Sequence, residues 1–248
     1  MKTSITENLD KQSYRWLSGK LYSWFMSSEC NEFRLAEYAL LSKIFQKLHG
    51  EFICCSGFSE QKNDAFCQNK QHCFSLGTVA DKQVSILSDI HFWPIQSQSA
   101  DIVLLHHVLE WTQHPQRVLR EVSRVICPGG VLVILAFNPW SLSSLCRFTS
   151  ACYPKEFRSV KLHSAGKIKK WLNTLGLTCE TLQFIMPWAP LHYPNHAKFL
   201  LKTSQSKFPA GSVFFIIAVK EKAQFIFKSS MLHRSNSVIN TSYAGAGF

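Results

Sequence analysis

Side chains that can move protons or hold a ligand lie in two short segments of the chain. The first contains His106, His107 and Glu110, and the second contains Asn138 and Trp140. An imidazole or a carboxyl group can act as a general acid or base, whereas a carboxamide and an indole can line a substrate pocket. Each also has a structural alternative: a fixed histidine at a strand end, a carboxylate that caps the following helix, a turn asparagine, or a tryptophan packed in the core.

Each segment directly follows an apolar run that predicts a buried strand. Residues 102–105 and 131–137 are continuously apolar, as in parallel strands with helices on both faces. Residues 118–126 carry apolar side chains at helical spacing, and Pro128 with the two glycines after it predicts a sharp turn. This order indicates a right-handed βαβ unit. Because open parallel sheets bind ligands beyond the carboxyl ends of their strands, both segments should face a ligand.

The rest of the chain continues the alternation of helices and strands. We expect N-terminal helical segments at 14–26 and 33–48, the second ended by Gly50. Further strands are predicted at 52–55, 72–76, 84–87, 182–186 and 213–219, with a helix at 166–175. These elements predict an N-terminal helical extension (1–50), an α/β domain (51–222) with an insertion at about 187–209, and a basic, disordered tail (223–248).

The net charge and composition of the chain restrict the kinds of protein that it can be. The net charge is +11, and residues 151–248 carry +10 of it. That basic half can attract nucleic acid or another anionic partner, although a solvated surface with a basic tail is the simpler explanation. No run reaches the roughly 18 apolar residues of a membrane span, and the N-terminus lacks a signal-peptide core, so we expect a cytoplasmic protein. Nine cysteines without CxxC pairs predict reduced thiols rather than a disulfide framework or a zinc site.

Four motifs give the chain a more specific resemblance. They are SDIHFWP at 88–94, HVLEW at 107–111, LREVSRVICPGG at 119–130 and KWLNTLGL at 170–177. Together they resemble class I S-adenosylmethionine-dependent methyltransferases of the small-molecule "type 11" kind. FNPWS after the second buried strand and WLSGKL near the N-terminus are similar to a bacterial subgroup of these enzymes. The resemblance implies an α/β fold with a doubly wound, mostly parallel seven-stranded sheet, which is the Rossmann-like methyltransferase fold, preceded by N-terminal helices.

The first two strands depart from the family pattern. The family has an acidic residue and a glycine-rich turn after the first strand, where glycines let the backbone approach the cofactor. Here the segment is CCSGFSE, in which only Gly57 remains and Phe58 adds a large side chain. The family's acidic residue after the second strand, which would hold the ribose hydroxyls, is absent from FSLG at 74–77. Asp89, the expected contact of the adenine amino group, is present.

Function follows from the resemblance as an expectation. It implies S-adenosylmethionine as cofactor, an unidentified small-molecule acceptor and no metal. An inactive relative that serves as a binding or regulatory module is the alternative, motivated by Phe58 and the missing acidic residue. The site residues implied are His107 and Glu110 for catalysis, Ser56, Gly57, Asp89, Ile90 and His106 for the cofactor, and Asn138 and Trp140 for the substrate.

Overall fold

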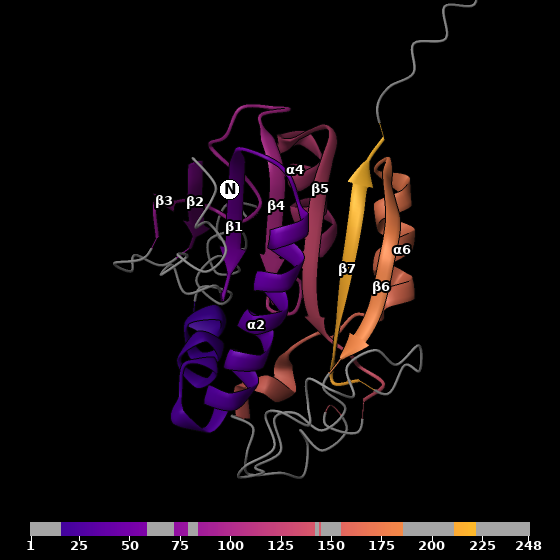
Figure 1. The fold of residues 1–248 in the computed structure, drawn as a ribbon. Helices are drawn as coiled ribbons and strands as arrows, with labels where there is room; N and C mark the ends of the chain where they lie inside the picture. Colours follow the sequence, from indigo (N-terminus) through magenta and orange to yellow (C-terminus); the bar gives the residue numbers. More distant parts are fainter. Residues whose placement is uncertain are drawn as a thin grey trace, which may run out of the picture.

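A single seven-stranded sheet organises the chain (Figure 1). The structure is a computed structural model that describes residues 16–58, 72–78, 84–141, 144, 155–185 and 211–221. The strands lie in the order β3-β2-β1-β4-β5-β7-β6. Their bounds are β1 Phe52–Gly57, β2 His72–Gly77, β3 Ile86–Leu87, β4 Ala100–His106, β5 Ile126–Phe137, β6 Leu177–Ile185 and β7 Val213–Lys220.

The sheet is parallel from β3 to β5 and antiparallel at β7. Strand β1 pairs in parallel with both β2 and β4, and β4 pairs in parallel with β5. Strand β7 runs antiparallel to both β5 and β6. The order of the parallel strands therefore reverses between β1 and β4, which is the place where such sheets bind ligands. The expected doubly wound, mostly parallel sheet is confirmed.

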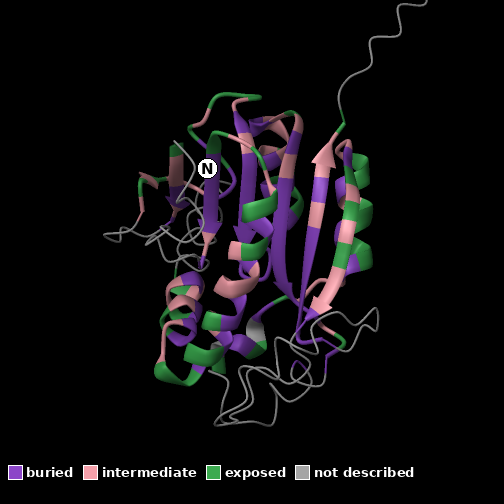
Figure 2. Cartoon of the chain, in the orientation of Figure 1, coloured by how far each residue is buried: buried purple, intermediate pink, exposed green. Residues whose placement is uncertain are grey.

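Burial follows the position of each strand in the sheet (Figure 2). Residues 102–105 of β4 and 132–137 of β5 are all buried, because helices cover both faces of these strands. Strand β6 instead alternates between inward and exposed side chains, as expected for a half-buried strand at the sheet edge. The central strands thus supply the core. Polar groups can stand at their carboxyl ends, where the chain leaves the apolar part of the strand.

Helices cover both faces of the sheet. In Figure 1, α2 (Asn31–Lys47) lies on the near face and α4 (Pro115–Val125) on the far face. Proline at the first position of α4 suits a helix start, because its missing N–H would have no helical partner. Helix α6 (Ala165–Thr174) packs against β6, β7 and α4, and the Ser164 side chain accepts a hydrogen bond from the Lys167 amide at its start.

The N-terminal residues join the same core as the sheet. Residues 16–25 are helical and lead through the short 3-10 helix η1 (Ser28–Cys30) into α2, and a second 3-10 helix, η2, spans Lys155–Ser159. The side chain of Phe25 is fully buried within that core. None of the described helices is both long and apolar enough to cross a membrane.

Several details differ from the expectations. The Pro-Gly-Gly segment is not a turn between helix and strand: α4 passes directly into β5 at Ile126, and the segment lies in an irregularity of the β4–β5 ladder. Strand β6 begins at Leu177 rather than at 182, and α2 ends at Lys47, before Gly50. Cys73 is disulfide-bonded, contrary to the expectation of reduced thiols. The expected insertion at 187–209 and the tail at 223–248 lie outside the described residues.

Candidate cofactor cavity and buried histidine–glutamate cluster

A cavity opens at the carboxyl ends of β1 and β2. Its walls come from three places: the helical residues 16–25, the ends of the two strands, and single residues from later loops. Within the described residues, none of the side chains that line it is charged. The lining residues are Ser18, Gly19, Tyr22, Cys55, Ser56, Gly57, Phe58, Ser75, Leu76, Gly77, Thr78, Val84 and Trp111.

Gly57 brings the end of β1 against the end of β4. It pairs with His106 in the sheet, and its backbone φ is +107°, a region that favours glycine. A Cβ atom at this position would lie 1.9 Å from the His106 carbonyl oxygen. The next amide, that of Phe58, donates to the same oxygen over 3.0 Å. This close approach explains why a glycine persists here, independently of any ligand.

The cavity has apolar walls, but it also contains a buried hydroxyl group that could bind a polar group of a ligand. The Ser56 side chain is buried, and its Oγ has no hydrogen-bond partner within the described protein. The Phe58 ring packs toward the N-terminal helices, with its centroid 5.2 Å from that of Phe25 and 6.1 Å from that of Tyr22. Phe58 is therefore one wall of a cavity that remains open beside it, and Ser56 and Gly57 line that same cavity.

Asp89 and Ile90 lie in the turn after β3, away from the lining of this cavity. One Asp89 oxygen, Oδ1, accepts from the His91 amide and lies 3.0 Å from His91 Nδ1. His91 Nε2 lies 2.9 Å from Thr112 Oγ1. Burial lowers the pKa of His91, and the neighbouring Asp89 opposes that shift. Ile90 is a fully buried core residue.

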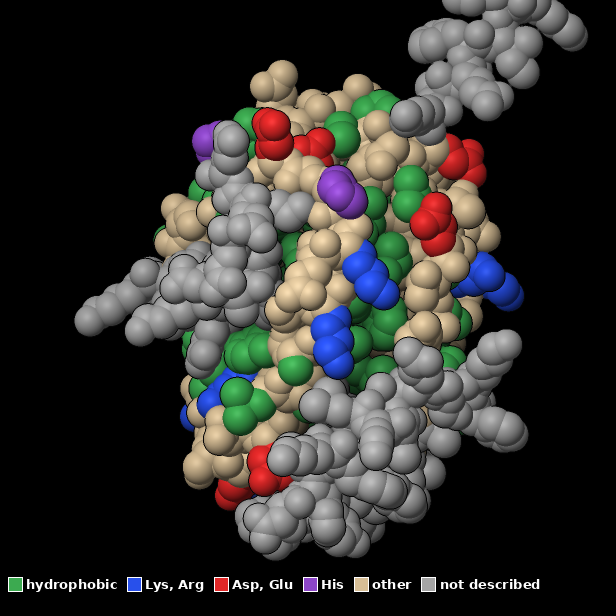
Figure 3. Space-filling view, viewed as in Figure 1, with side chains coloured by type: hydrophobic (Ala, Val, Ile, Leu, Met, Phe, Trp, Pro, Cys, Tyr) green, Lys and Arg blue, Asp and Glu red, His purple; other side chains and the backbone are tan. Residues whose placement is uncertain are grey.

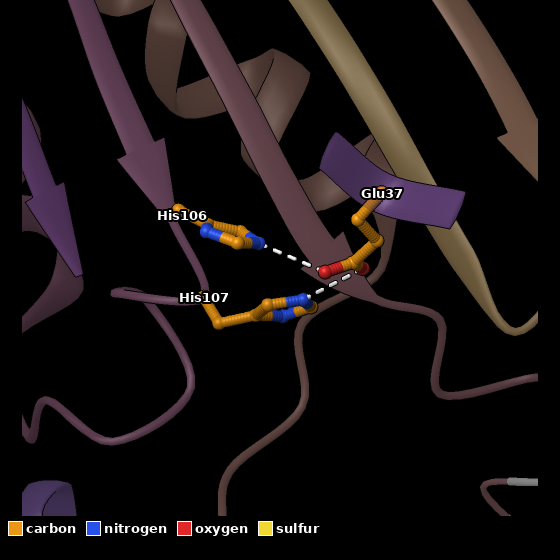
Figure 4. Close-up of side chains that lie close together, drawn as sticks. All are labelled: Glu37, His106 and His107. Atoms are coloured by element: carbon orange, nitrogen blue, oxygen red, sulfur yellow. Dashed lines mark hydrogen bonds and ion pairs between the residues drawn. The ribbon is translucent and has the colours of Figure 1, made fainter. Parts of the chain in front are cut away.

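A buried cluster lies at the carboxyl end of β4 (Figure 4). Glu37, from α2, faces two consecutive histidines. Its Oε2 lies 2.8 Å from His106 Nε2, and its Oε1 lies 2.9 Å from His107 Nε2. All three side chains are 0% exposed. Helix α2 is thus fixed to the end of β4 by both oxygens of one carboxylate.

The backbone at His107 is what lets both histidines reach Glu37. Successive residues of a strand point to opposite faces, so two neighbouring histidines would normally diverge. His107 instead adopts a left-handed conformation with φ +53°, and its amide donates to the Leu135 carbonyl over 3.0 Å. The two imidazole centroids consequently lie 4.9 Å apart.

Glu110 extends the cluster to β5. Its Oε1 accepts from the Phe137 amide over 2.8 Å and lies 2.9 Å from His107 Nδ1. Its Oε2 is buried and has no hydrogen-bond partner among the described residues. Helix α4 begins at Pro115 after a His114 cap without a side-chain bond, so Glu110 does not cap it. Glu110 joins the ends of β4 and β5 instead.

Charge in the cluster is distributed unequally between the two histidines. Burial alone would raise the pKa of Glu37, but the imidazoles of His107 and His106 outweigh it and lower that pKa to about 2. Burial alone would lower the pKa of His107, but Glu37 and Glu110 outweigh it and raise that pKa to about 9. For His106 burial prevails, and its pKa is lowered. Both ring nitrogens of a protonated His107 therefore donate to carboxylates, and neither can accept a proton.

Asn138 and Trp140 follow β5 and lie outside the cavity lining. Asn138 is buried, and its Nδ2 donates to the Gly211 carbonyl over 2.8 Å. Its Oδ1 accepts from the Trp140 amide over 3.1 Å, while the Trp140 side chain is 74% exposed. Asn138 thus joins the end of β5 to the segment before β7.

Comparisons with known proteins give a family match for part of the chain and a shared fold for most of it. Residues 50–134 match the family model of a methyltransferase domain. YafS, an uncharacterised protein of Escherichia coli K12, is 30% identical over 107 residues, covering 42% of this chain and 45% of YafS, so the match spans less than half of that relative. A SAM-dependent methyltransferase of Thermotoga maritima, described as a possible histamine N-methyltransferase, is similar in structure with a TM-score of 0.59 at 13% identity, over 85% of this chain and 99% of that one. Residues 50–134 thus match a methyltransferase domain, and the fold as a whole is that of S-adenosylmethionine-dependent methyltransferases.

A second solved structure shows how widely this methyltransferase fold is used. The [4+2]-cyclase SpnF is similar with a TM-score of 0.53 at 12% identity, over 75% of this chain and 80% of SpnF. The methyltransferase fold therefore does not by itself fix the reaction, and the site must decide it.

Glu37 is the residue of the buried cluster that sequence reasoning missed. A signal for it exists: Glu37 lies four residues after Phe33 and four before Leu41, on the apolar face of α2. A carboxylate on such a face needs a buried partner. Its partners, His106 and His107, lie 69 and 70 residues later in the chain, so the sequence did not reveal the pairing.

The prediction of a nucleic-acid or other anionic partner remains a prediction. On the face shown in Figure 3, the Lys, Arg, Asp and Glu side chains of the described part are scattered among apolar and other side chains. Of the basic residues of the C-terminal half, the exposed Lys169 and Lys170 lie on α6, and the Lys167 ammonium lies 5.1 Å from the centroid of the Trp171 ring.

Proposed function

We propose that this chain is an S-adenosylmethionine-dependent methyltransferase that acts on a small-molecule acceptor and holds its cofactor in the cavity at the ends of β1 and β2. One observation carries the proposal. The cavity lies beside the point where the order of the parallel strands reverses, and Ser56 and Gly57, the two residues expected to contact the cofactor there, both line it. Ligands of open parallel sheets bind at that place.

The described residues would hold the cofactor mainly by shape and hydrogen bonds. Ser56 Oγ is a buried hydroxyl that needs a partner, and a polar group of the ligand would provide one. Gly57 also lines the cavity, although the place of its missing side chain is taken by the His106 carbonyl. The cofactor, when bound, supplies an activated methyl group. The protein then has to orient the acceptor and take a proton from it where it carries one.

Glu110 is better placed than His107 to take that proton. Both nitrogens of His107 face carboxylate oxygens, at 2.9 Å in each case, so we assign His107 to positioning Glu110. Glu110 Oε2 is buried and has no partner among the described residues, and its role as the base stays a prediction because Glu110 lies outside the cavity lining. Asp89, Ile90 and His106 as cofactor contacts, and Asn138 and Trp140 as substrate contacts, stay predictions.

The alternative is a binding module that does not transfer a methyl group. It is favoured by the uncharged lining of the cavity in the described residues, where no carboxylate stands at the end of β2 to hold a ribose diol. Similarity to SpnF, a [4+2]-cyclase, also leaves the reaction open. The two functions differ in whether a small molecule gains a methyl group, not in whether the cavity binds a ligand.

Binding of S-adenosylhomocysteine to the full chain, measured by isothermal titration and thermal shift, tests the proposal. Ligand at 100 times its dissociation constant should stabilise the fold by about 2.7 kcal/mol. A leucine at Gly19, which lines the cavity and has open space at its Cβ, should lower the affinity at least tenfold. Gly166→Leu is the matched control, because Gly166 is also helical and has open space, but lies outside the cavity.

Three outcomes decide between the functions. If the folded wild-type chain does not bind S-adenosylhomocysteine, the proposal is contradicted. Unchanged affinity in Gly19→Leu shows that the ligand binds elsewhere, which contradicts the assigned cavity. Binding without methyl transfer to any acceptor in a small-molecule extract, followed with a methyl-labelled cofactor, favours the binding module.

A further inference from the structure

The cluster at the end of β4 brings two imidazole nitrogens and one carboxylate close together (Figure 4). We propose that Glu37, His106 and His107 form a closed site for one divalent first-row metal ion, and that Zn²⁺ is the ion the ligand set fits best. The inference does not depend on the methyltransferase proposal, because the three side chains lie outside the lining of the cofactor cavity.

The donor atoms suit a four-coordinate ion. One ligand atom from each of the three residues lies within 4.8 Å of the others. Each Glu37 oxygen faces a different imidazole nitrogen, at 2.8 Å for His106 and 2.9 Å for His107, so two nitrogens and two oxygens surround a common centre. Around a tetrahedral Zn²⁺ with ligands at about 2.0–2.2 Å, each nitrogen and the oxygen that it faces would lie roughly 3.3 Å apart, whereas the two oxygens of the one carboxylate stay closer together. A small outward movement of the imidazoles therefore makes room for the ion.

The surroundings match those of metal-binding histidines. A histidine that binds a metal usually donates its other ring N–H to a carboxylate, which fixes the tautomer. His107 has this arrangement, because its Nδ1 lies 2.9 Å from Glu110 Oε1. Glu110 Oε1 is itself held by the Phe137 amide over 2.8 Å. The carboxylate that supports His107 is therefore in place before an ion arrives.

A divalent ion would also suit the charge of the cluster. The cluster contains two carboxyl groups, from Glu37 and Glu110, in a buried environment where unbalanced charge is costly. One divalent ion held by Glu37 and two neutral imidazoles would place positive charge beside both carboxyl groups.

The backbone is strained in the way that the site requires. His107 has φ +53°, which is uncommon for a residue other than glycine, although histidine adopts it more often than most residues do. Such strain persists where the surroundings over-determine it, and it gathers at functional sites. Here it turns two consecutive histidines toward one carboxylate. Because the three side chains are 0% exposed, the site keeps no open position and the ion joins α2 to β4 structurally.

Zinc content of the purified full chain, free of any affinity tag, tests the inference. The chain is loaded with Zn²⁺, dialysed, and analysed by mass spectrometry of the element and by X-ray absorption at the zinc edge. We expect about one Zn²⁺ per chain, four-coordinate with nitrogen and oxygen ligands only. Glu37→Gln should retain less than a tenth of that zinc. Glu121→Gln is the matched control, since this carboxylate is held by Arg124 outside the cluster, and it should bind zinc like the wild type.

A second variant keeps the test decisive if Glu37→Gln does not fold. Glu110→Gln leaves all three ligands in place and should weaken zinc affinity by about 10–100-fold, because Glu110 supports His107. Competition with a chromophoric chelator measures that change. A folded wild-type chain that binds no zinc, a Glu37→Gln protein that binds as much as wild type, or an unchanged affinity in Glu110→Gln overturns the site. The Gly19→Leu protein should still bind zinc but should lose binding of S-adenosylhomocysteine. A failure of the zinc site can therefore be distinguished from a failure of the proposed function.

Discussion

Replacing Gly57 by alanine tests the packing that forms the cavity wall. The added Cβ would lie 1.9 Å from the His106 carbonyl oxygen and 2.8 Å from Val108 Cγ2. The first of these neighbours is backbone, which cannot rotate away as a side chain can. The ends of β1 and β4 would therefore have to separate, or the residue would have to leave its backbone conformation at φ +107°.

The expected loss of stability follows from two contributions. A residue with a side chain in a sparsely populated backbone region costs about 1–3 kcal/mol. Separating the strand ends also removes the 3.0 Å hydrogen bond from the Phe58 amide to His106, which contributes about 1 kcal/mol. We expect Gly57→Ala to lose about 3 kcal/mol of unfolding free energy, and the Tm to fall by roughly 6–12 °C for a chain of this size.

Urea and thermal denaturation of the purified chain measure the effect. Gly166→Ala, in α6, is the control: nothing lies within 4 Å of its Cβ, and alanine favours a helix. The control should gain up to about 1 kcal/mol, so the two identical substitutions should change stability in opposite directions. If Gly57→Ala stays within about 0.5 kcal/mol of the wild type, the close approach of β1 and β4 is wrong.

Three further changes test other parts of the structure. Ser164→Ala removes the side-chain cap of α6 and should cost about 1 kcal/mol in urea denaturation; no loss would mean that the cap does not form. Asn138→Ala leaves the buried Gly211 carbonyl without its side-chain donor and should cost about 1–3 kcal/mol in the same assay; a neutral result would contradict that bond. Because burial lowers the pKa of His91, the unfolded chain binds its proton first, so stability should fall as pH drops from 7 to 5, and His91→Gln should reduce that fall in thermal scans across pH; an unchanged slope would exclude His91 as a source.

The sequence was sufficient for the architecture because the signals were local and strong. Continuous apolar runs marked β4 and β5, and a clear apolar stripe marked α4 between them. The edge of the sheet was harder to predict. Strand β6 alternates between buried and exposed positions, so its polar first half looked like a loop and only its end was predicted. The Pro-Gly-Gly segment carried turn residues, yet the β4–β5 ladder accommodates them as an irregularity.

The site residues could be predicted only where their place in the site follows from their position along one strand. Ser56 and Gly57 could be placed by their position after the first strand, and both line the cavity. The contacts of Glu37 with two histidines depend on how α2 packs over the sheet, which no local pattern encodes. The left-handed backbone at His107 could not be predicted either, because only a small fraction of histidines adopt it, even though histidine does so more often than most residues.

The separation of Glu37 from its partners also has a consequence for how the chain is made. Synthesis adds about 5–20 residues per second, and 69 residues separate Glu37 from His106. Glu37 is therefore added to the chain roughly 3–14 s before the first of its two histidines. Until then α2 holds a charged group without its partners on a face that is otherwise apolar. Helix α2 therefore cannot pack in its final position before β4 has been synthesised.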